Sequence, residues 1–102
     1  MPENIAAEMK AQLIQLLASH PGVRRIILFG SRARGTGWER SDVDLAVDAS
    51  GMTEEEWAQA WADVVCEVDT LLRIDVGRLD QAPADRRESV DREGVVLYAR
   101  GA

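Results

Sequence analysis

The sequence predicts an α+β domain whose helices and strands follow one another in the order α-β-β-α-β-α-β. Its 102 residues suit one hydrophobic core, so we expect a single domain over residues 1–102. Short segments in which apolar residues alternate or run together indicate strands, and apolar residues three or four positions apart indicate helices. No repeat, linker or low-complexity tract separates these segments.

The first two elements are a helix and a buried strand. Residues 3–18 carry apolar side chains at helical spacing, and the His-Pro-Gly sequence at 20–22 ends the helix. The run at 26–29, Ile-Ile-Leu-Phe, is apolar at every position, which is typical of a central strand covered on both faces. This strand ends at Gly30.

The second strand alternates strictly from residue 42 to residue 48. Successive side chains of a strand point to opposite faces of its sheet. We expect the apolar set to lie in the core and the other set to point away from it. The two sets are Val43, Leu45 and Val47, and Asp42, Asp44, Ala46 and Asp48.

A second helix begins at Thr53, which can form a capping box with Glu56. We expect its apolar stripe to pack in the core, although its two tryptophans could instead form a patch for a protein partner. The stripe comprises Trp57, Trp61, Val64, Val65, Val68, Leu71 and Leu72.

A third strand is expected over residues 73–79, which alternate again. Ile74 and Val76 point inward, and Asp75 lies on the polar face.

The last two elements are a short helix and a strand. The helix follows Pro83 and ends at Gly94, and residues 95–98 form the strand.

The composition excludes several classes of function. With 12 basic and 18 acidic residues the formal net charge is -6, which opposes nonspecific binding to nucleic acid or to anionic membranes. The single Cys66 rules out an intrachain disulfide and a four-cysteine zinc site, so a reducing cytoplasm is the expected compartment. No run of about 18 apolar residues indicates a membrane span, and no signal-peptide pattern is present.

Asp42 and Asp44 are the first candidate functional residues. On a strand, residues two apart share a face, with α-carbons about 6.5 to 7 Å apart. Carboxylates this close repel each other unless a cation or a proton lies between them, and magnesium commonly takes one or two protein carboxylates together with phosphate oxygens. Such a pair could also be solvated surface. Asp75, on the same kind of polar face, adds a third acid.

Gly30 and Ser31 leave the first strand and open a helical turn, where backbone N–H groups and the hydroxyl can bind a phosphate. Ser31 could instead be only a helix cap. Trp38 in the following loop could stack on a base or fold back onto the domain. Arginines gather around this stretch, where they could attract an anion or form surface ion pairs: Arg24, Arg25, Arg32, Arg34 and Arg40.

Taken together, "GSRARGTGWERSDVDLAV" resembles the signature of the polymerase-β-like nucleotidyltransferase superfamily: Gly-Ser, about ten residues, then Asp-x-Asp. The chain resembles its small stand-alone form, the minimal nucleotidyltransferase (MNT) domain. "RIDVGRLD" is similar to the strand of the third carboxylate, and "VDREGVVLYA" to the closing helix and strand. Gly77 departs from the pattern, because a bulkier strand residue is expected there.

The resemblance implies a polymerase-β-like palm, with a mixed β-sheet and helices packed largely on one face. It also implies that Asp42, Asp44 and Asp75 are catalytic and bind magnesium, two ions in all, and that Asp75 can act as a base. Gly30 and Ser31 would hold the triphosphate of ATP, with Arg32 and Arg34 as further candidates for phosphate contact.

The implied function is a metal-dependent transfer of AMP from ATP to a hydroxyl. With 102 residues there is no room for an acceptor-binding domain, so the acceptor is expected on another chain. For MNT domains the resemblance implies a helical HEPN toxin, modified on a tyrosine, with the MNT protein as the antitoxin. Two alternatives stay open: a module that neutralises its partner by contact alone, and the nucleotide-binding subunit of a two-component small-molecule adenylyltransferase.

Overall fold

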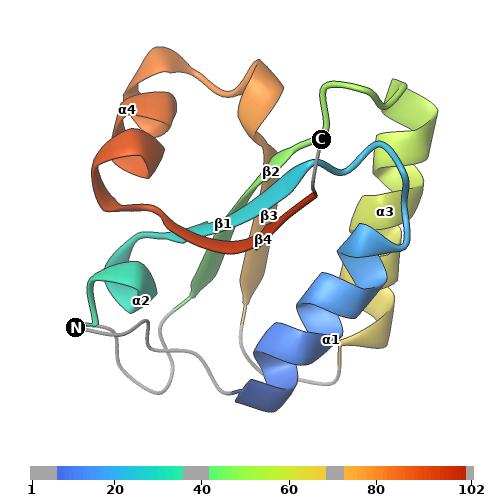
Figure 1. Cartoon of the computed structure of the whole chain (residues 1–102), viewed down its shortest axis with the longest axis horizontal. Coiled ribbons are helices and arrows are strands. Elements are labelled where there is room, and N and C mark those ends of the chain that lie inside the picture. The colour runs from blue at the N-terminus through green and yellow to red at the C-terminus, as the bar shows by residue number, and fades with distance from the viewer. Residues whose placement is uncertain (1–6, 36–41, 69–72, 101–102) are drawn as a thin grey trace.

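The computed structural model describes residues 7–35, 42–68 and 73–100. Four strands form one sheet, and helices lie on both of its faces (Figure 1). The elements in chain order are α1 (Ala7–Ala18), β1 (Arg25–Phe29), α2 (Ser31–Arg34), β2 (Val43–Asp48), α3 (Glu54–Glu67), β3 (Ile74–Arg78), the 3-10 turn η1 (Leu79–Gln81), α4 (Ala84–Glu93) and β4 (Val95–Ala99). The predicted order of helices and strands is confirmed; α2 is the helical turn expected after Gly30, and η1 is a short addition.

The sheet is mixed, as predicted. Its strand order is β3-β2-β1-β4; β1 pairs antiparallel with β2 and with β4, whereas β2 and β3 are parallel. The parallel pair requires a crossover, which α3 supplies. β1 therefore lies inside the sheet, in agreement with its uninterrupted apolar sequence.

The main core lies between the sheet and the pair α1 and α3, which run side by side (Figure 1). Leu13 and Leu17 of α1 and Val64 of α3 are fully buried against the inward side chains of β1 and β2. Two polar contacts also join these helices: His20 Nε2 lies 2.8 Å from Asp63 Oδ2, and Gln12 donates to the carbonyl of Glu67. The predicted inward set of β2 is entirely buried: Val43, Leu45 and Val47.

The opposite face of the sheet is partly covered by α4, so the prediction of helices largely on one face holds with this exception. Val90 of α4 packs on Ile27 and Ala46, and the three are nearly inaccessible to solvent. Ala46 lies on the face opposite the main core, as predicted, but α4 covers it there, so it is buried in a second, smaller cluster.

The helix α3 begins as predicted, with Thr53 and Glu56 in a reciprocal capping box. Its apolar stripe is only partly buried. Trp57 packs against the core, but Trp61 is 45% and Val65 48% exposed, so their assignment to the core is wrong. The stripe is wider than the surface that the sheet and α1 offer. Leu71 and Leu72, like Ile5, Trp38 and Arg40, lie outside the described residues.

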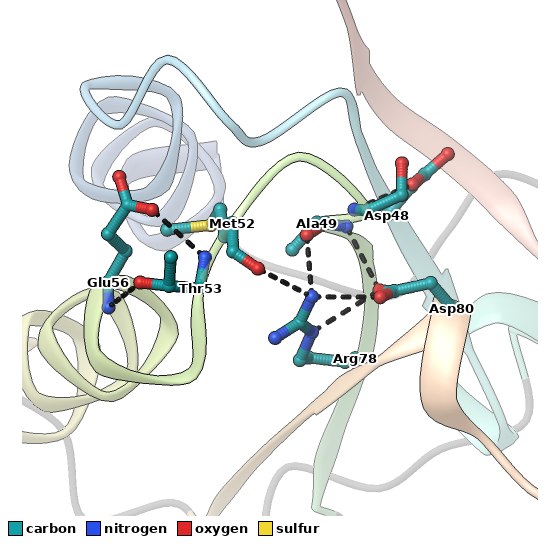
Figure 2. Close-up of polar contacts among 8 residues, drawn as sticks. Asp48, Ala49, Met52, Thr53, Glu56, Arg78 and Asp80 are labelled. Atoms are coloured by element: carbon teal, nitrogen blue, oxygen red, sulfur yellow. Dashed lines mark hydrogen bonds and ion pairs between the residues drawn. The ribbon is translucent and has the colours of Figure 1, made fainter.

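The far end of β2 and β3 is held by a buried arginine. Arg78 donates to the carbonyls of Ala49 and Met52, at 2.8 and 3.1 Å, and pairs with Asp80 at 2.9 Å (Figure 2). Asp80 in turn accepts a hydrogen bond from the amide of Ala49. This group ties the loop between β2 and α3 to β3, at the end of the strands opposite the candidate site.

Candidate functional site

Asp44 and Asp75 lie side by side in the sheet. They are register partners on the parallel strands β2 and β3, and Phe29 of β1 is the partner of Asp44 on its other side. Register partners point to the same face, and neighbouring strands are only about 4.8 Å apart. The sheet therefore places two carboxylates next to each other on the face that α4 partly covers.

The electrostatic state of Asp44 reflects this crowding. Its pKa is raised above the ordinary value, first by partial burial and then by the negative charges of Asp75 and Asp42. Arg86 and Arg73 act in the opposite direction. Asp42 is exposed and directly precedes β2. The three predicted carboxylates thus form one electrostatic group.

Gly30 brings the Gly-Ser turn against this group. Its φ is 78° and its ψ is -157°, a combination that is essentially restricted to glycine. A Cβ on Gly30 would lie 2.6 Å from Oδ2 of Asp44. The absence of a side chain therefore allows the backbone at the end of β1 to approach the carboxylate.

Of the residues predicted to bind nucleotide, Ser31 directly follows this contact and opens α2. The two arginines behave differently. Arg32 is buried, with 5% of its surface exposed, whereas Arg34 is exposed and places Nη1 2.8 Å from Oε2 of Glu93. Arg34 thereby links α2 to the end of α4. Of the two roles considered for it, anion binding and a surface ion pair, the structure shows the ion pair.

Arg24 and Arg25 are separated from the three predicted carboxylates. Arg24 and Arg25 stand at the start of β1, whereas Gly30 follows its end. They line a hollow of about 790 Å³ together with Asp48 and Arg100. Arg24 and Arg25 are close to the Gly-Ser turn in the sequence, but they do not add positive charge next to the candidate carboxylates.

Arg86 on α4 is a residue of this site that the sequence did not reveal. Its guanidinium lies 3.9 Å from Oδ2 of Asp75 and over the ring of Phe29, 5.7 Å from the ring centre. Nothing in the sequence of α4 sets it apart from the neighbouring Arg87. The unexpected Gly77 was an indirect signal, since a Cβ there would lie 3.3 Å from Nη1 of Arg86.

The donor set fits magnesium, which the superfamily resemblance implies. Within the described ranges no three acidic, histidine or cysteine side chains are already gathered into a cage. Magnesium needs no such cage, because it usually binds one or two carboxylates and completes its shell with water and substrate phosphates. Partial burial and then the repulsion from Asp75 and Asp42 raise the pKa of Asp44, and a bound divalent cation would relieve that repulsion.

Comparison with known proteins agrees with this geometry. The family described as "Polymerase beta, Nucleotidyltransferase" matches residues 11–101. No curated protein sequence matches the chain. In the part of the chain that the structure describes, no helix has the length and apolar character needed to cross a membrane.

Solved structures show the same fold in toxin-antitoxin systems. A toxin-antitoxin complex with AMP-PNP is 28% identical, with a TM-score of 0.67, and the match covers 89% of this chain and 73% of that chain. The MntA-HepT complex is 22% identical over 93% of this chain and 74% of that one, with a TM-score of 0.69. A structure of a tri-AMPylated HEPN toxin in complex with its MNT antitoxin, from Shewanella oneidensis, contains a chain that is 22% identical to this one. The match covers 91% of this chain and 71% of that chain, with a TM-score of 0.67.

Proposed function

This chain belongs to the polymerase beta nucleotidyltransferase family, and we propose that it transfers AMP from ATP to a hydroxyl group on a protein partner. The observation that carries the proposal is the register of Asp44 and Asp75, with Gly30 against Asp44. A paired set of carboxylates beside a glycine-serine turn combines a cation site with a place for phosphates.

We assign the residues as follows. Gly30 and Ser31 hold the triphosphate at the end of β1. Asp42, Asp44 and Asp75 would hold magnesium, and two ions suit this number of acids. Magnesium, when bound, neutralises phosphate charge and stabilises the oxygens that enter and leave at phosphorus.

The residues of the chain then carry out an in-line displacement. The acceptor hydroxyl attacks the α-phosphorus of ATP, the new O–P bond forms as the bond to pyrophosphate breaks, and Asp75 takes the hydroxyl proton. Asp75 suits this role because β3 is an edge strand and an acceptor can approach it from outside the sheet. The side chain is half-buried, so it is accessible and still held in place.

We propose a helical HEPN-type toxin as the partner and one of its tyrosines as the acceptor, which makes this chain an antitoxin. The support is the likeness to antitoxin chains, including one from a complex with AMP-PNP that is 28% identical. Arg34 has a structural role in this scheme, since Glu93 already occupies its guanidinium.

A second candidate function is neutralisation by contact alone. The exposed side chains of Trp61 and Val65, one turn apart on α3, favour it because they offer an apolar surface to another protein. In that case the nucleotide site would be dispensable for protection from the toxin.

The decisive experiment incubates the protein with ATP labelled at the α-phosphate and magnesium, with and without a candidate HEPN-type partner protein. Label should move to the partner and be lost with Asp44→Asn or Asp75→Asn. Asp48→Asn is the matched control, because it lies at the other end of the same strand. Omission of magnesium tests the metal dependence.

Two outcomes would contradict the proposal. If no label moves, and the double variant Asp42→Ala with Asp44→Ala still protects cells from the toxin, the chain acts by contact alone. If label moves to a small molecule such as an aminoglycoside, the chain is the nucleotide-binding subunit of a small-molecule adenylyltransferase.

A further inference from the structure

Arg86 reaches across the sheet from α4 to the candidate site. Its guanidinium lies over the Phe29 ring of β1, 5.7 Å from the ring centre. It also lies 3.9 Å from the carboxylate of Asp75 on β3. Phe29 and Asp75 are the two register partners of Asp44. A permanent positive charge therefore lies beside the row of side chains that contains the carboxylates.

The sheet has a space for this guanidinium directly behind the carboxylates. The next row of side chains on the same face lies two positions from Phe29, Asp44 and Asp75 along each strand. It consists of the register partners Ile27, Ala46 and Gly77. Ala46 and Gly77 are the smallest residues available, and a Cβ on Gly77 would already lie 3.3 Å from Nη1 of Arg86. The glycine that looked out of place in a strand is thus explained by the arginine above it.

Stability alone is a poor explanation for this arrangement. The side chains of Arg86 and Asp75 are 41% and 39% exposed, and an ion pair exposed to this degree contributes little to folding. Strand β3, moreover, has a glycine where a β-branched residue would favour the strand. Gly77 lowers the strand propensity of β3, but it leaves space for the Arg86 guanidinium next to the Asp75 carboxylate.

We propose that Arg86 is a positioning residue, which holds the Asp75 carboxylate in the orientation needed to receive the acceptor proton. This inference rests on the proposed nucleotidyl transfer. Phe29 and Gly77 confine the guanidinium from two sides, and the guanidinium confines Asp75, which lies on the edge strand of the described sheet. The nearby Asp44 also senses this charge, since Arg86 opposes the rise of its pKa.

The test compares Arg86→Gln and Arg86→Lys with the control Arg87→Gln, which changes the next, exposed residue of α4. Loss of a residue that orients a functional group typically costs 10- to 100-fold in activity. We expect Arg86→Gln to lower kcat for transfer to the HEPN-type partner by about that factor, with the KM for ATP little changed. Arg86→Lys should recover part of the rate, because it keeps the charge but not the planar fork.

A further variant moves the Arg86 guanidinium without replacing Arg86 itself. Gly77→Val leaves Arg86 in the chain but fills the space of its guanidinium, so it should lower kcat in the same direction as Arg86→Gln. Urea unfolding of every variant shows whether the fold is intact, and Gly77→Val should be no less stable than the parent because valine favours strands.

A readout independent of activity uses protein labelled with ¹³C at its aspartate carboxyls, without nucleotide or metal. The Asp75 carboxyl resonance should shift in Arg86→Gln and in Gly77→Val and remain in place in Arg87→Gln.

The outcomes distinguish this inference from the function on which it rests. If the parent protein transfers no label, the proposed function fails and this role of Arg86 fails with it. If the parent is active and Arg86→Gln matches Arg87→Gln in kcat, only the positioning role is overturned. An increase in KM for ATP at unchanged kcat would overturn it as well, in favour of nucleotide binding by Arg86.

Discussion

Oδ2 of Asp44 lies so close to Gly30 that a Cβ at position 30 would be only 2.6 Å away. This contact joins the end of β1 to the middle of the candidate site. The backbone of Gly30, with φ of 78° and ψ of -157°, independently excludes other residues. One glycine therefore satisfies two separate requirements.

Gly30→Ala should accordingly damage both stability and activity. A side chain in this backbone region costs about 1 to 3 kcal/mol, and the added methyl group pushes on the Asp44 carboxylate. Urea unfolding should show a loss in this range, and the labelled-ATP assay should show little or no transfer. Gly51→Ala is the control, since its Cβ would meet nothing closer than 3.8 Å; an equal loss there would contradict the argument.

Asp44→Asn should separate activity from stability. Partial burial and the charges of Asp75 and Asp42 raise the pKa of Asp44, so its ionised form is disfavoured in the folded state. For a raised carboxyl pKa, stability is highest at low pH and falls as the group ionises. At pH 7 the asparagine variant should therefore be inactive and more stable than the parent. Asp91→Asn should change neither property, and a less stable Asp44→Asn would contradict the proposed repulsion.

Arg78→Ala should destabilise the protein without touching the candidate site. The Arg78 side chain is 6% exposed, and its removal takes the guanidinium donor away from the carbonyls of Ala49 and Met52 and takes the paired charge away from the Asp80 carboxylate (Figure 2). We expect a loss of about 2 to 4 kcal/mol in the free energy of unfolding. Arg87→Ala, on the exposed face of α4, should lose less than about 0.5 kcal/mol.

The same group predicts how stability depends on pH. Partial burial acts to raise the pKa of Asp80, but hydrogen bonds from Arg78 and from the Ala49 amide outweigh it, and the pKa falls below the ordinary value of 3.8. A lowered carboxyl pKa adds stability above the unfolded-state value, and this stability is lost as pH falls through the folded-state value.

Urea unfolding at a series of pH values from 7 downward should therefore show the parent losing stability below about pH 4, with Asp80→Asn less stable at pH 7 and less sensitive to acid. Parallel curves for the two proteins would show that Asp80 does not contribute.

Local patterns were sufficient for the elements of the fold. The capping box of Thr53 and Glu56 marked the start of α3, and the alternation from residue 42 onward separated buried Val43 from half-buried Asp44. Such signals depend on neighbours within a few positions. They were insufficient for Trp61, because helical spacing shows which side chains share a face but not how much surface another element offers to cover it.

The nature of the candidate site was already present in the order of residues, since Gly-Ser after a buried strand and two aspartates on one strand face require only local geometry. The register that brings Asp75 beside Asp44 and the packing of α4 that carries Arg86 over Gly77 depend on contacts between distant segments. Hydrophobic burial on both faces of the sheet decides those contacts, and no spacing along the chain encodes them. The tertiary structure therefore turned a pair of acids into a site with the positive charge of Arg86 over it and with Asp75 on the edge strand of the described sheet.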